Sequence, residues 1–273
     1  MNQFRYKPRK SKELDKEKCH VVKIGGKLID DKDLYHQFLN GFGQLEGSKI
    51  LVHGGGKMGS EVLDRMDIPI RYHEGRRITD RQSMDVLVMV YAGSINKSIT
   101  ADLQSLQCNA IGLSGCDLNI IRAVKRPVKE IDYGYAGDIQ EINVPALNSL
   151  LKMGAVPVIS PITHNLSGQL LNTNADTIAA AISAALADSF EVELHYCFEL
   201  IGVLEDIKKE YSLIRMMNYL EYLRYRDEGT IHKGMLPKLS NAFTALQNNV
   251  HRVTIGDPDH FLRREGHTVL VNQ

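Results

Sequence analysis

Two glycine-rich turns carry the residue types best suited to binding a phosphate group. Gly25-Gly26 follows the apolar stretch Cys19–Ile24, and Gly54-Gly55-Gly56 follows the apolar stretch Ile50–Val52. After the second turn, apolar residues recur at helical spacing over Lys57–Met66. Glycine lets backbone N–H groups approach an anion closely, and the N-terminus of a helix adds partial positive charge. Both turns are therefore candidate anion-binding sites.

Three charged residues lie close to such turns or to predicted helix starts. Lys23 precedes the first turn, Asp176 lies in the first turn of a helix predicted over Ala175–Ala187, and Lys238 follows Pro237 at another helix start. A lysine at a strand end is usually a surface residue, and an acid in the first turn of a helix usually stabilises the helix. Taken singly, these residues leave open whether they are catalytic or structural.

The glycines alone fit more than one kind of site. A Walker A loop is excluded, because G-x-x-x-x-G-K-[ST] does not occur in the chain. Gly54–Gly59 fits the G-x-G-x-x-G pattern of dinucleotide sites, but Asp80, the acid at the required distance, is predicted to begin a helix. His53–Gly56 fits an esterase oxyanion hole, but the G-x-S-x-G nucleophile motif is missing. Dinucleotide binding and esterase activity stay open as alternatives to phosphate binding.

Strand and helix patterns alternate along the chain. Strands joined through helices pair in parallel with right-handed crossovers, and ligands bind beyond their carboxyl ends. We therefore predict an α/β fold, an open αβα sandwich with a mainly parallel central sheet and two lobes. Both glycine turns lie at the ligand-binding edge. The predicted strands are Cys19–Ile24, Lys49–His53, Asn109–Leu113, Ala155–Ile159, Glu191–Tyr196 and His251–Ile255; the helices are Asp31–Leu45, Lys57–Met66, Arg81–Leu106, Val144–Met153, Ala175–Ala187, Tyr211–Arg226 and Leu236–Asn248; and the hairpins are Ile68–Asp80 and Ile120–Val124 with Ala136–Ile142.

The predicted domains follow from composition and from the order of the elements. Residues 1–18 form a polar, basic N-terminal segment. Residues 19–173 form a first lobe that contains both glycine turns, and residues 174–273 form a second lobe. The second lobe begins with the sequence that leads into the alanine-rich helix.

Composition and charge exclude several classes of protein. The 33 lysines and arginines balance 33 aspartates and glutamates, so no global basic field favours nucleic acid or an anionic membrane. The four cysteines are scattered and the ten histidines show no H-x-x-x-H spacing, so we predict no disulfide framework and no metal ligand. The chain has no apolar run of membrane-spanning length and no signal peptide. We expect a cytoplasmic protein that binds neither nucleic acid nor a membrane.

Eight short motifs follow one another along the chain: Val22–Gly26, His53–Gly56, Gly75–Asp80, Asn96-Lys97, Gly112–Gly115, Gly134–Asp138, Asn172–Asp176 and Gly234–Lys238. Together and in this order, they resemble the motifs of the acetylglutamate kinases in the amino acid kinase family. The resemblance covers about residues 21 to 248. It implies ATP-dependent phosphorylation of the γ-carboxylate of an N-acyl-L-glutamate in arginine biosynthesis, with Mg²⁺ as cofactor. N-succinylglutamate, whose extra carboxylate could bind Arg71 or Arg76, and a non-catalytic amino-acid-binding regulatory module remain alternatives.

The resemblance also implies a role for individual residues. The implied catalytic residues are Lys23, Asp176 and Lys238, with Asp176 holding both lysines. The implied substrate-binding residues are Gly55, Gly56, Arg77, Asn172 and Asn174. The implied nucleotide-binding residues are Gly25, Gly26, Glu199, Gly202 and Gly234, and no residue is assigned to a metal.

The residue types suit this chemistry. A substrate γ-carboxylate with a pKa of about 4.3 is ionised at neutral pH, so no general base is needed to deprotonate it. Because both reactants are anionic, phosphoryl transfer depends on positioning and on cations. The lysines supply the cations, and the lysines together with the glycine N–H groups supply the positioning.

Three stretches depart from the family pattern. Cys197–Val203 lacks the common aspartate and glycine turn, although Glu199 could replace the aspartate. His232–Met235 stands where relatives often have Thr-Gly-Gly-Met, and Cys116 where a lysine is common. These departures concern the nucleotide geometry rather than the fold.

The assembly is predicted from a single element. The long helix over Arg81–Leu106 offers a two-fold contact surface, with Met89 and Tyr91 expected at outward positions. We therefore expect a homodimer.

Overall fold

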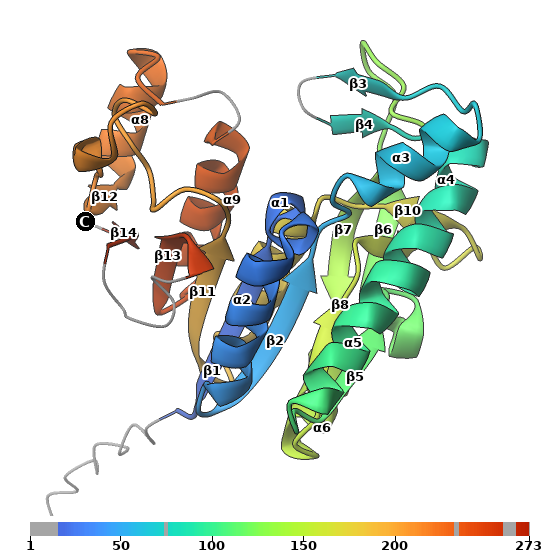
Figure 1. The fold of residues 1–273 in the computed structure, drawn as a ribbon, viewed down its shortest axis with the longest axis horizontal. Coiled ribbons are helices and arrows are strands. Elements are labelled where there is room, and N and C mark those ends of the chain that lie inside the picture. Colours follow the sequence, from blue (N-terminus) through green and yellow to red (C-terminus); the bar gives the residue numbers. More distant parts are fainter. Residues whose placement is uncertain (1–15, 74–75, 232–234, 259–265, 273) are drawn as a thin grey trace, which may run out of the picture.

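The computed structural model describes residues 16–73, 76–231, 235–258 and 266–272. At its centre lies an eight-stranded sheet with the order β12-β14-β13-β11-β1-β2-β8-β5 (Figure 1). All neighbouring pairs are parallel except β13 and β14. The mainly parallel α/β sheet predicted from the sequence is confirmed. Its strands are β1 (Lys18–Ile24), β2 (Ser48–His53), β5 (Ala110–Leu113), β8 (Val156–Ile159), β11 (Glu191–Cys197), β12 (Met216–Asn218), β13 (Arg252–Gly256) and β14 (Thr268–Val271).

Helices cover both faces of this sheet, because alternate residues of each strand point to opposite sides. Val22 and Ile24 of β1 pack into one core with α2, whereas Cys19 and Val21 pack into the other core with α7. The first face is covered by α2 (Lys32–Gln44), α4 (Arg81–Leu87), η1 (Val88–Ile95) and α5 (Asn96–Ser105), and the second by α6 (Val144–Lys152), α7 (Ala175–Leu186), α8 (Tyr219–Asp227) and α9 (Leu236–Gln247). Within the described ranges, no helix is long and apolar enough to cross a membrane.

The central sheet runs through both predicted lobes without a break. β1 belongs to the first predicted lobe and β11 to the second, and the two strands pair over seven residues. The division at residues 173 and 174 stays a prediction.

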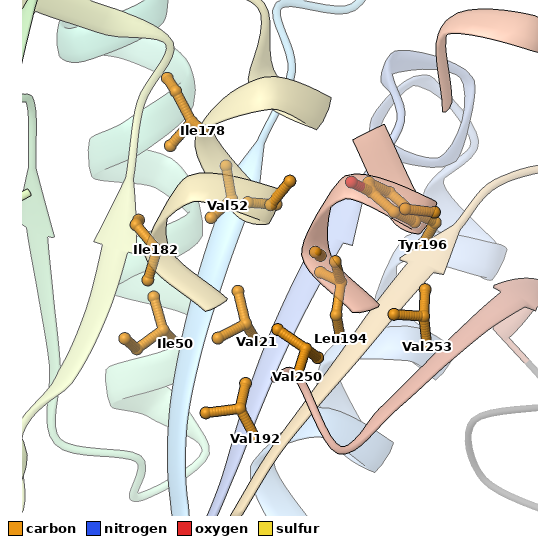
Figure 2. Packing of buried hydrophobic residues seen from close by; sticks show 14 of the residues in the cluster. Val21, Ile50, Val52, Ile178, Ile182, Val192, Leu194, Tyr196, Val250 and Val253 are labelled. Carbon is orange, nitrogen blue, oxygen red and sulfur yellow. The ribbon is translucent and has the colours of Figure 1, made fainter. Parts of the chain in front are cut away.

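Helix α7 lies close to the sheet because its residues are small. Ala179 and Ala180 are buried, and Figure 2 shows Ile178 and Ile182 lying over Ile50 and Val52 of β2. Close packing places the first turn of α7 beside the carboxyl end of β1. Packing in the core therefore holds the start of α7 close to the carboxyl end of β1.

Two smaller sheets stand beside the same edge (Figure 1). One has four strands, in the order β10-β9-β6-β7, and the other is a hairpin of β3 and β4 that precedes α4. Both hairpins predicted from the sequence, β3 with β4 and β6 with β7, are confirmed. The remaining elements are α1 (Gly26–Asp30), α3 (Met58–Arg65), β3 (Arg71–His73), β4 (Arg76–Ile78), β6 (Ile121–Lys125), β7 (Gly137–Ile142), β9 (Ile162–His164), β10 (Leu170–Asn172) and the short helices η2 (Asp117–Asn119) and η3 (Glu210–Ser212).

The helix predicted over Tyr211–Arg226 begins eight residues later, at Tyr219. The Asn218 side chain accepts a hydrogen bond from the N–H of Glu221, whose side chain accepts one from the N–H of Asn218. This capping box fixes the helix start. The residues just before it, Met216–Asn218, form β12 at the edge of the sheet instead.

The long helix predicted over Arg81–Leu106 is continuous, but its middle third, η1, is a π-helix. Wider π turns change which side chains point inward. Met89 is exposed as expected, but Tyr91 is only 6 % exposed. The prediction that Tyr91 points outward was therefore wrong.

Candidate active site

One buried carboxylate holds two ammonium groups at the edge of the central sheet. Asp176 Oδ1 lies 2.7 Å from Lys23 Nζ, and Asp176 Oδ2 lies 2.7 Å from Lys238 Nζ. Lys23 and Asp176 are each 7 % exposed. The three residues come from β1, α7 and α9, and the structure thus brings together the whole predicted catalytic group.

The charges of this cluster depend on one another. Burial lowers the pKa of the Lys23 ammonium to about 8, while the carboxylate of Asp176 acts in the opposite direction. Burial alone would raise the pKa of the Asp176 carboxyl, but the two lysines outweigh it and hold that pKa well below its usual range. Asp176 is therefore ionised at neutral pH, and it is unsuited to act as a general base.

Local sequence explains how the three side chains meet. Asn174 caps α7 by accepting a hydrogen bond from the N–H of Thr177 at 3.1 Å, which places Asp176 in the first helical turn. The Tyr196 hydroxyl donates to the Asp176 backbone carbonyl at 3.0 Å. Lys238 follows Pro237 in the first turn of α9, where proline favours helix initiation.

A cavity of about 270 Å³ opens beside the cluster and collects the predicted substrate-binding residues. Lys23 and Asp176 line one part of it. All five predicted substrate-binding residues also line it: Gly55, Gly56, Arg77, Asn172 and Asn174. Asn172 is held in place by donating from its side-chain amide to Thr79 Oγ1 at 3.0 Å.

Arg77 presents an unsatisfied donor in this cavity. Its Nη2 donates to Ser60 Oγ at 2.8 Å and to the Tyr72 hydroxyl, and its guanidinium lies 4.8 Å from the centre of the Tyr72 ring. Its Nη1 is buried and has no hydrogen-bond partner among the described residues. A buried donor without a partner is costly, and a carboxylate would satisfy it with a strong, charge-assisted bond.

The second glycine turn is packed so closely at Gly55 that it leaves no room for a larger side chain there. A Cβ atom on Gly55 would lie 2.1 Å from two ring atoms of Tyr91, and Gly56 has a φ of +57°, which favours glycine. A Cβ atom on Gly26 would lie 2.3 Å from the Cα of Gly56, so the two turns contact each other directly. The predicted proximity of the turns is confirmed.

His53 anchors this turn to the sheet. It is fully buried, and burial lowers its pKa to about 4, so the imidazole is neutral at pH 7. Its Nδ1–H donates to Gly54 O at 2.9 Å, and its Nε2 accepts from the Asn96 amide at 3.1 Å. The tautomer is fixed by these partners, and it leaves no proton for acid catalysis.

The predicted nucleotide-binding residues are less closely grouped. The N–H of Gly25 already donates to Cys197 O at 3.1 Å, and Glu199 forms an ion pair with Lys27 at 2.6 Å. Gly202 lies against Thr268 and lines a second cavity, of about 450 Å³. Gly234 lies outside the described residues.

Sequence reasoning missed several residues around the cavity. Tyr72 lies directly opposite Arg77 in the β3–β4 register, so the predicted hairpin, with its register, could have identified it. Tyr91 gave no such signal, because the π turn that buries it has no sequence pattern. Arg126 also lines the cavity, and so does Arg76, one of the two arginines considered for a succinyl carboxylate.

Comparison with known sequences places the chain in a family. The sequence profile of the amino acid kinase family matches residues 18–257. The chain belongs to the amino acid kinase family. Two relatives carry the name acetylglutamate kinase. The one from Bacteroides fragilis is 46 % identical over 244 residues, covering 89 % of this chain and 94 % of that protein. The one from Parabacteroides distasonis is 44 % identical over 254 residues, covering 93 % and 100 %.

A solved structure of the same fold agrees with this membership of the amino acid kinase family. N-acetylglutamate synthase from Neisseria gonorrhoeae, complexed with coenzyme A and N-acetyl-glutamate, matches with a TM-score of 0.79 at 22 % identity. The match covers 93 % of this chain and 59 % of the synthase chain. The likeness shows the fold alone, and the resemblance inferred from the eight motifs is confirmed by the family match and the relatives.

The contact between Gly55 and Tyr91 yields a first prediction. Gly55→Ala should lower the free energy of unfolding by about 1–3 kcal/mol, because the new methyl group overlaps the Tyr91 ring. Gly54→Ala is the matched control, since its nearest contact would be Ile24 O at 3.7 Å, an ordinary van der Waals distance. Urea unfolding of both variants measures the difference, and equal losses would contradict the packing described.

Proposed function

We propose that this chain transfers the γ-phosphoryl group of ATP to the γ-carboxylate of N-acetyl-L-glutamate, as a kinase of arginine biosynthesis. The observation that carries the proposal is the cluster of Lys23, Asp176 and Lys238 beside a cavity that also contains Arg77. The acetylglutamate kinases that are 44–46 % identical over most of the chain support the same activity.

The main obstacle to the reaction is repulsion between two anions. Two unit charges about 4 Å apart repel by about 1 kcal/mol in water, and by about 4 kcal/mol at the lower effective dielectric near a protein surface. Lys23 and Lys238 offset this repulsion, with Lys23 near the transferring phosphoryl group and Lys238 on the leaving side. Asp176 acts as a positioning residue, because it fixes both ammonium groups before any substrate arrives.

The amino acid binds through its two carboxylates. We assign the α-carboxylate to the unsatisfied Nη1 of Arg77, and the γ-carboxylate to backbone N–H groups of Gly55 and Gly56. Asn172 and Asn174 line the same cavity and orient the substrate between these anchors.

The acyl group is assigned from the relatives, and two arginines near the substrate-binding residues agree with that assignment. The guanidinium of Arg126 already binds the carboxylate of Asp138, with Nε 3.1 Å from Oδ1. Arg71 faces Asp80 at 3.6 Å. Arg126 and Arg71 are thus already paired with carboxylates of the chain, and the relatives named acetylglutamate kinase support an uncharged acetyl group over a succinyl group.

The nucleotide is assigned to the second cavity. This cavity is lined by apolar side chains that include Leu200, Val203 and Ile231, by Gly202, and by the acidic residues Glu205 and Asp206. It also includes Met235, three residues before Lys238, so its occupant lies close to the catalytic edge along the chain. Gly26 remains the candidate phosphate-binding glycine of the first turn.

Mg²⁺ fits this arrangement only through the nucleotide. Among the described residues that line the 270 Å³ cavity, Asp176 is the one carboxylate, and two lysines occupy it. Phosphate oxygens usually hold much of the Mg²⁺ coordination shell, and the ion neutralises phosphate charge when bound.

We further propose that the enzyme acts in the cytoplasm as a homodimer, with the exposed Met89 in its contact surface.

A coupled ADP-release assay tests the activity. We expect turnover with N-acetyl-L-glutamate, and little or none with N-succinylglutamate, free glutamate or aspartate. Lys23→Ala and Lys238→Ala should each lower kcat by about 10²–10³, the usual loss for one preorganised charge stabiliser. Lys152→Ala, an exposed lysine at the end of α6, is the control and should not change kcat.

Three outcomes would contradict parts of this account. Binding of N-acetylglutamate without any ADP release would indicate a non-catalytic module. Preference for N-succinylglutamate would overturn the acyl assignment alone. Turnover at the normal rate in either lysine variant would overturn the mechanism.

The Arg77 assignment gives a separate prediction. Arg77→Lys should raise KM for the amino acid by at least about tenfold, because a point charge cannot reproduce a guanidinium fork. KM for ATP should change little, since Arg77 lies with the amino-acid residues. Steady-state kinetics with each substrate varied in turn measure both KM values. A change confined to KM for ATP would contradict the assignment of Arg77 to the amino acid.

A further inference from the structure

We propose that His20, Glu193 and His195 form a binding site for one divalent transition-metal ion, best matched by Zn²⁺. The site lies on the face of the central sheet opposite to the catalytic cluster. His20 and Lys23 are three residues apart on β1, so their side chains point to opposite faces. The inference does not depend on the proposed function.

Neighbouring strands bring these residues together from distant parts of the sequence. Glu193 and His195 alternate along β11 and therefore share one face. His20 on β1 is directly paired with Glu193 in the parallel register. Linear histidine spacing gave no sign of this arrangement, because 175 residues separate the two histidines.

The distances between the ligand atoms fit a metal ion. His20 Nδ1 lies 3.2 Å from His195 Nε2, Glu193 Oε2 lies 3.8 Å from His20 Nδ1, and it lies 3.6 Å from His195 Nε2. The point in their plane equidistant from all three atoms is about 2.1 Å from each, and a tetrahedral ion, which lies outside that plane, would have bonds of about 2.2 Å, at the upper end of ordinary Zn–N and Zn–O bond lengths.

These separations also favour a tetrahedral ion over an octahedral one. Ligand atoms of a tetrahedral zinc centre lie about 3.3–3.4 Å apart, whereas adjacent ligands of an octahedral centre of similar bond length lie about 3.0 Å apart. All three observed separations exceed the octahedral value, and their mean of about 3.5 Å lies closer to the tetrahedral value. Two imidazoles and one carboxylate are a ligand set that zinc uses, with a further position left for water.

The surrounding contacts orient the ligands. His195 Nδ1 lies 2.8 Å from Thr254 Oγ1, and a proton on Nδ1 leaves the Nε2 lone pair directed at the site. Glu193 Oε1 faces the ammonium of Lys18 at 3.8 Å, which leaves Oε2 for the ion.

Burial makes the three ligands preorganised but still reachable. His20 and His195 are 5 % and 7 % exposed, whereas the Glu193 side chain is 13 % exposed. Within the described ranges, this is the one group of three metal-ligating side chains that converge in this way. An ion here would join β1 to β11, and thus the two predicted lobes, about 10 Å along β1 from Lys23.

Metal titration of the full-length protein tests the site. After treatment with a chelator and buffer exchange, Zn²⁺ should bind with one ion per chain by elemental analysis. At about 100 times its Kd, Zn²⁺ should raise Tm by about 5–10 °C, because an ion that binds only the folded state stabilises it. Co²⁺ should give the intense visible absorption of a tetrahedral centre, and Zn²⁺ should abolish it.

Matched variants separate this site from adventitious binding. Glu193→Gln and His195→Gln should each weaken Zn²⁺ binding by at least about tenfold and remove the Co²⁺ spectrum. His251→Gln, an exposed histidine, and Cys116→Ser, an exposed thiol, should change neither. Glu193→Gln preserves side-chain shape, so it decides the outcome if His195→Gln does not fold.

The proposal is overturned by any of three results. These are the absence of a Zn²⁺-dependent change in Tm, binding that persists unchanged in both ligand variants, and binding that is lost in Cys116→Ser. The first would leave His20 and His195 as a hydrogen-bonded pair in the sheet.

Discussion

The cost of burying the Asp176 carboxylate constrains the whole active site. Removing one ion from water costs several kcal/mol even after relaxation, so a buried carboxylate needs close partners with excellent geometry. Asp176 has two close cationic partners, Lys23 and Lys238, each 2.7 Å away, and Lys238 also donates a hydrogen bond to Oδ2. The cluster retains a net positive charge, and that charge lies beside the cavity where two anions would have to meet. Stability and chemistry therefore depend on the same contacts.

The fold is built to bring those contacts to one place. Parallel pairing sets the end of β1 beside the ends of β2 and β11, and small residues let α7 lie close above them. The glycine turns fit because no side chain separates Gly26 from Gly56, and Tyr91 closes the second turn from the helical side. Each of these elements tolerates little displacement, because its nearest neighbour is backbone or a ring. The proposed reaction thus depends on groups that rigid packing holds in position, and it needs no general base.

Much of this could be predicted from the sequence, and the failures have physical causes. Strand and helix signals placed Lys23, Asp176 and Lys238 on their elements, and the family resemblance implied that they lie close together. The π turn that buries Tyr91 leaves the apolar spacing of a helix nearly unchanged, so its direction was predicted wrongly. Short edge strands such as β12 gain their pairing from tertiary contacts rather than from local pattern. The late start of α8 could have been predicted from Asn218 and Glu221, whose residue types and spacing fit a capping box.

The most direct test of the central claim is a double-mutant cycle on kcat with Asp176→Asn and Lys238→Gln. If the cluster acts as a unit, each single variant loses most of the rate and the double variant loses little more, because residues that act together are strongly non-additive. We predict a double-variant loss within about tenfold of the worse single variant. Losses that multiply would mean that Asp176 and Lys238 act independently, and would contradict the claim that one carboxylate organises the site.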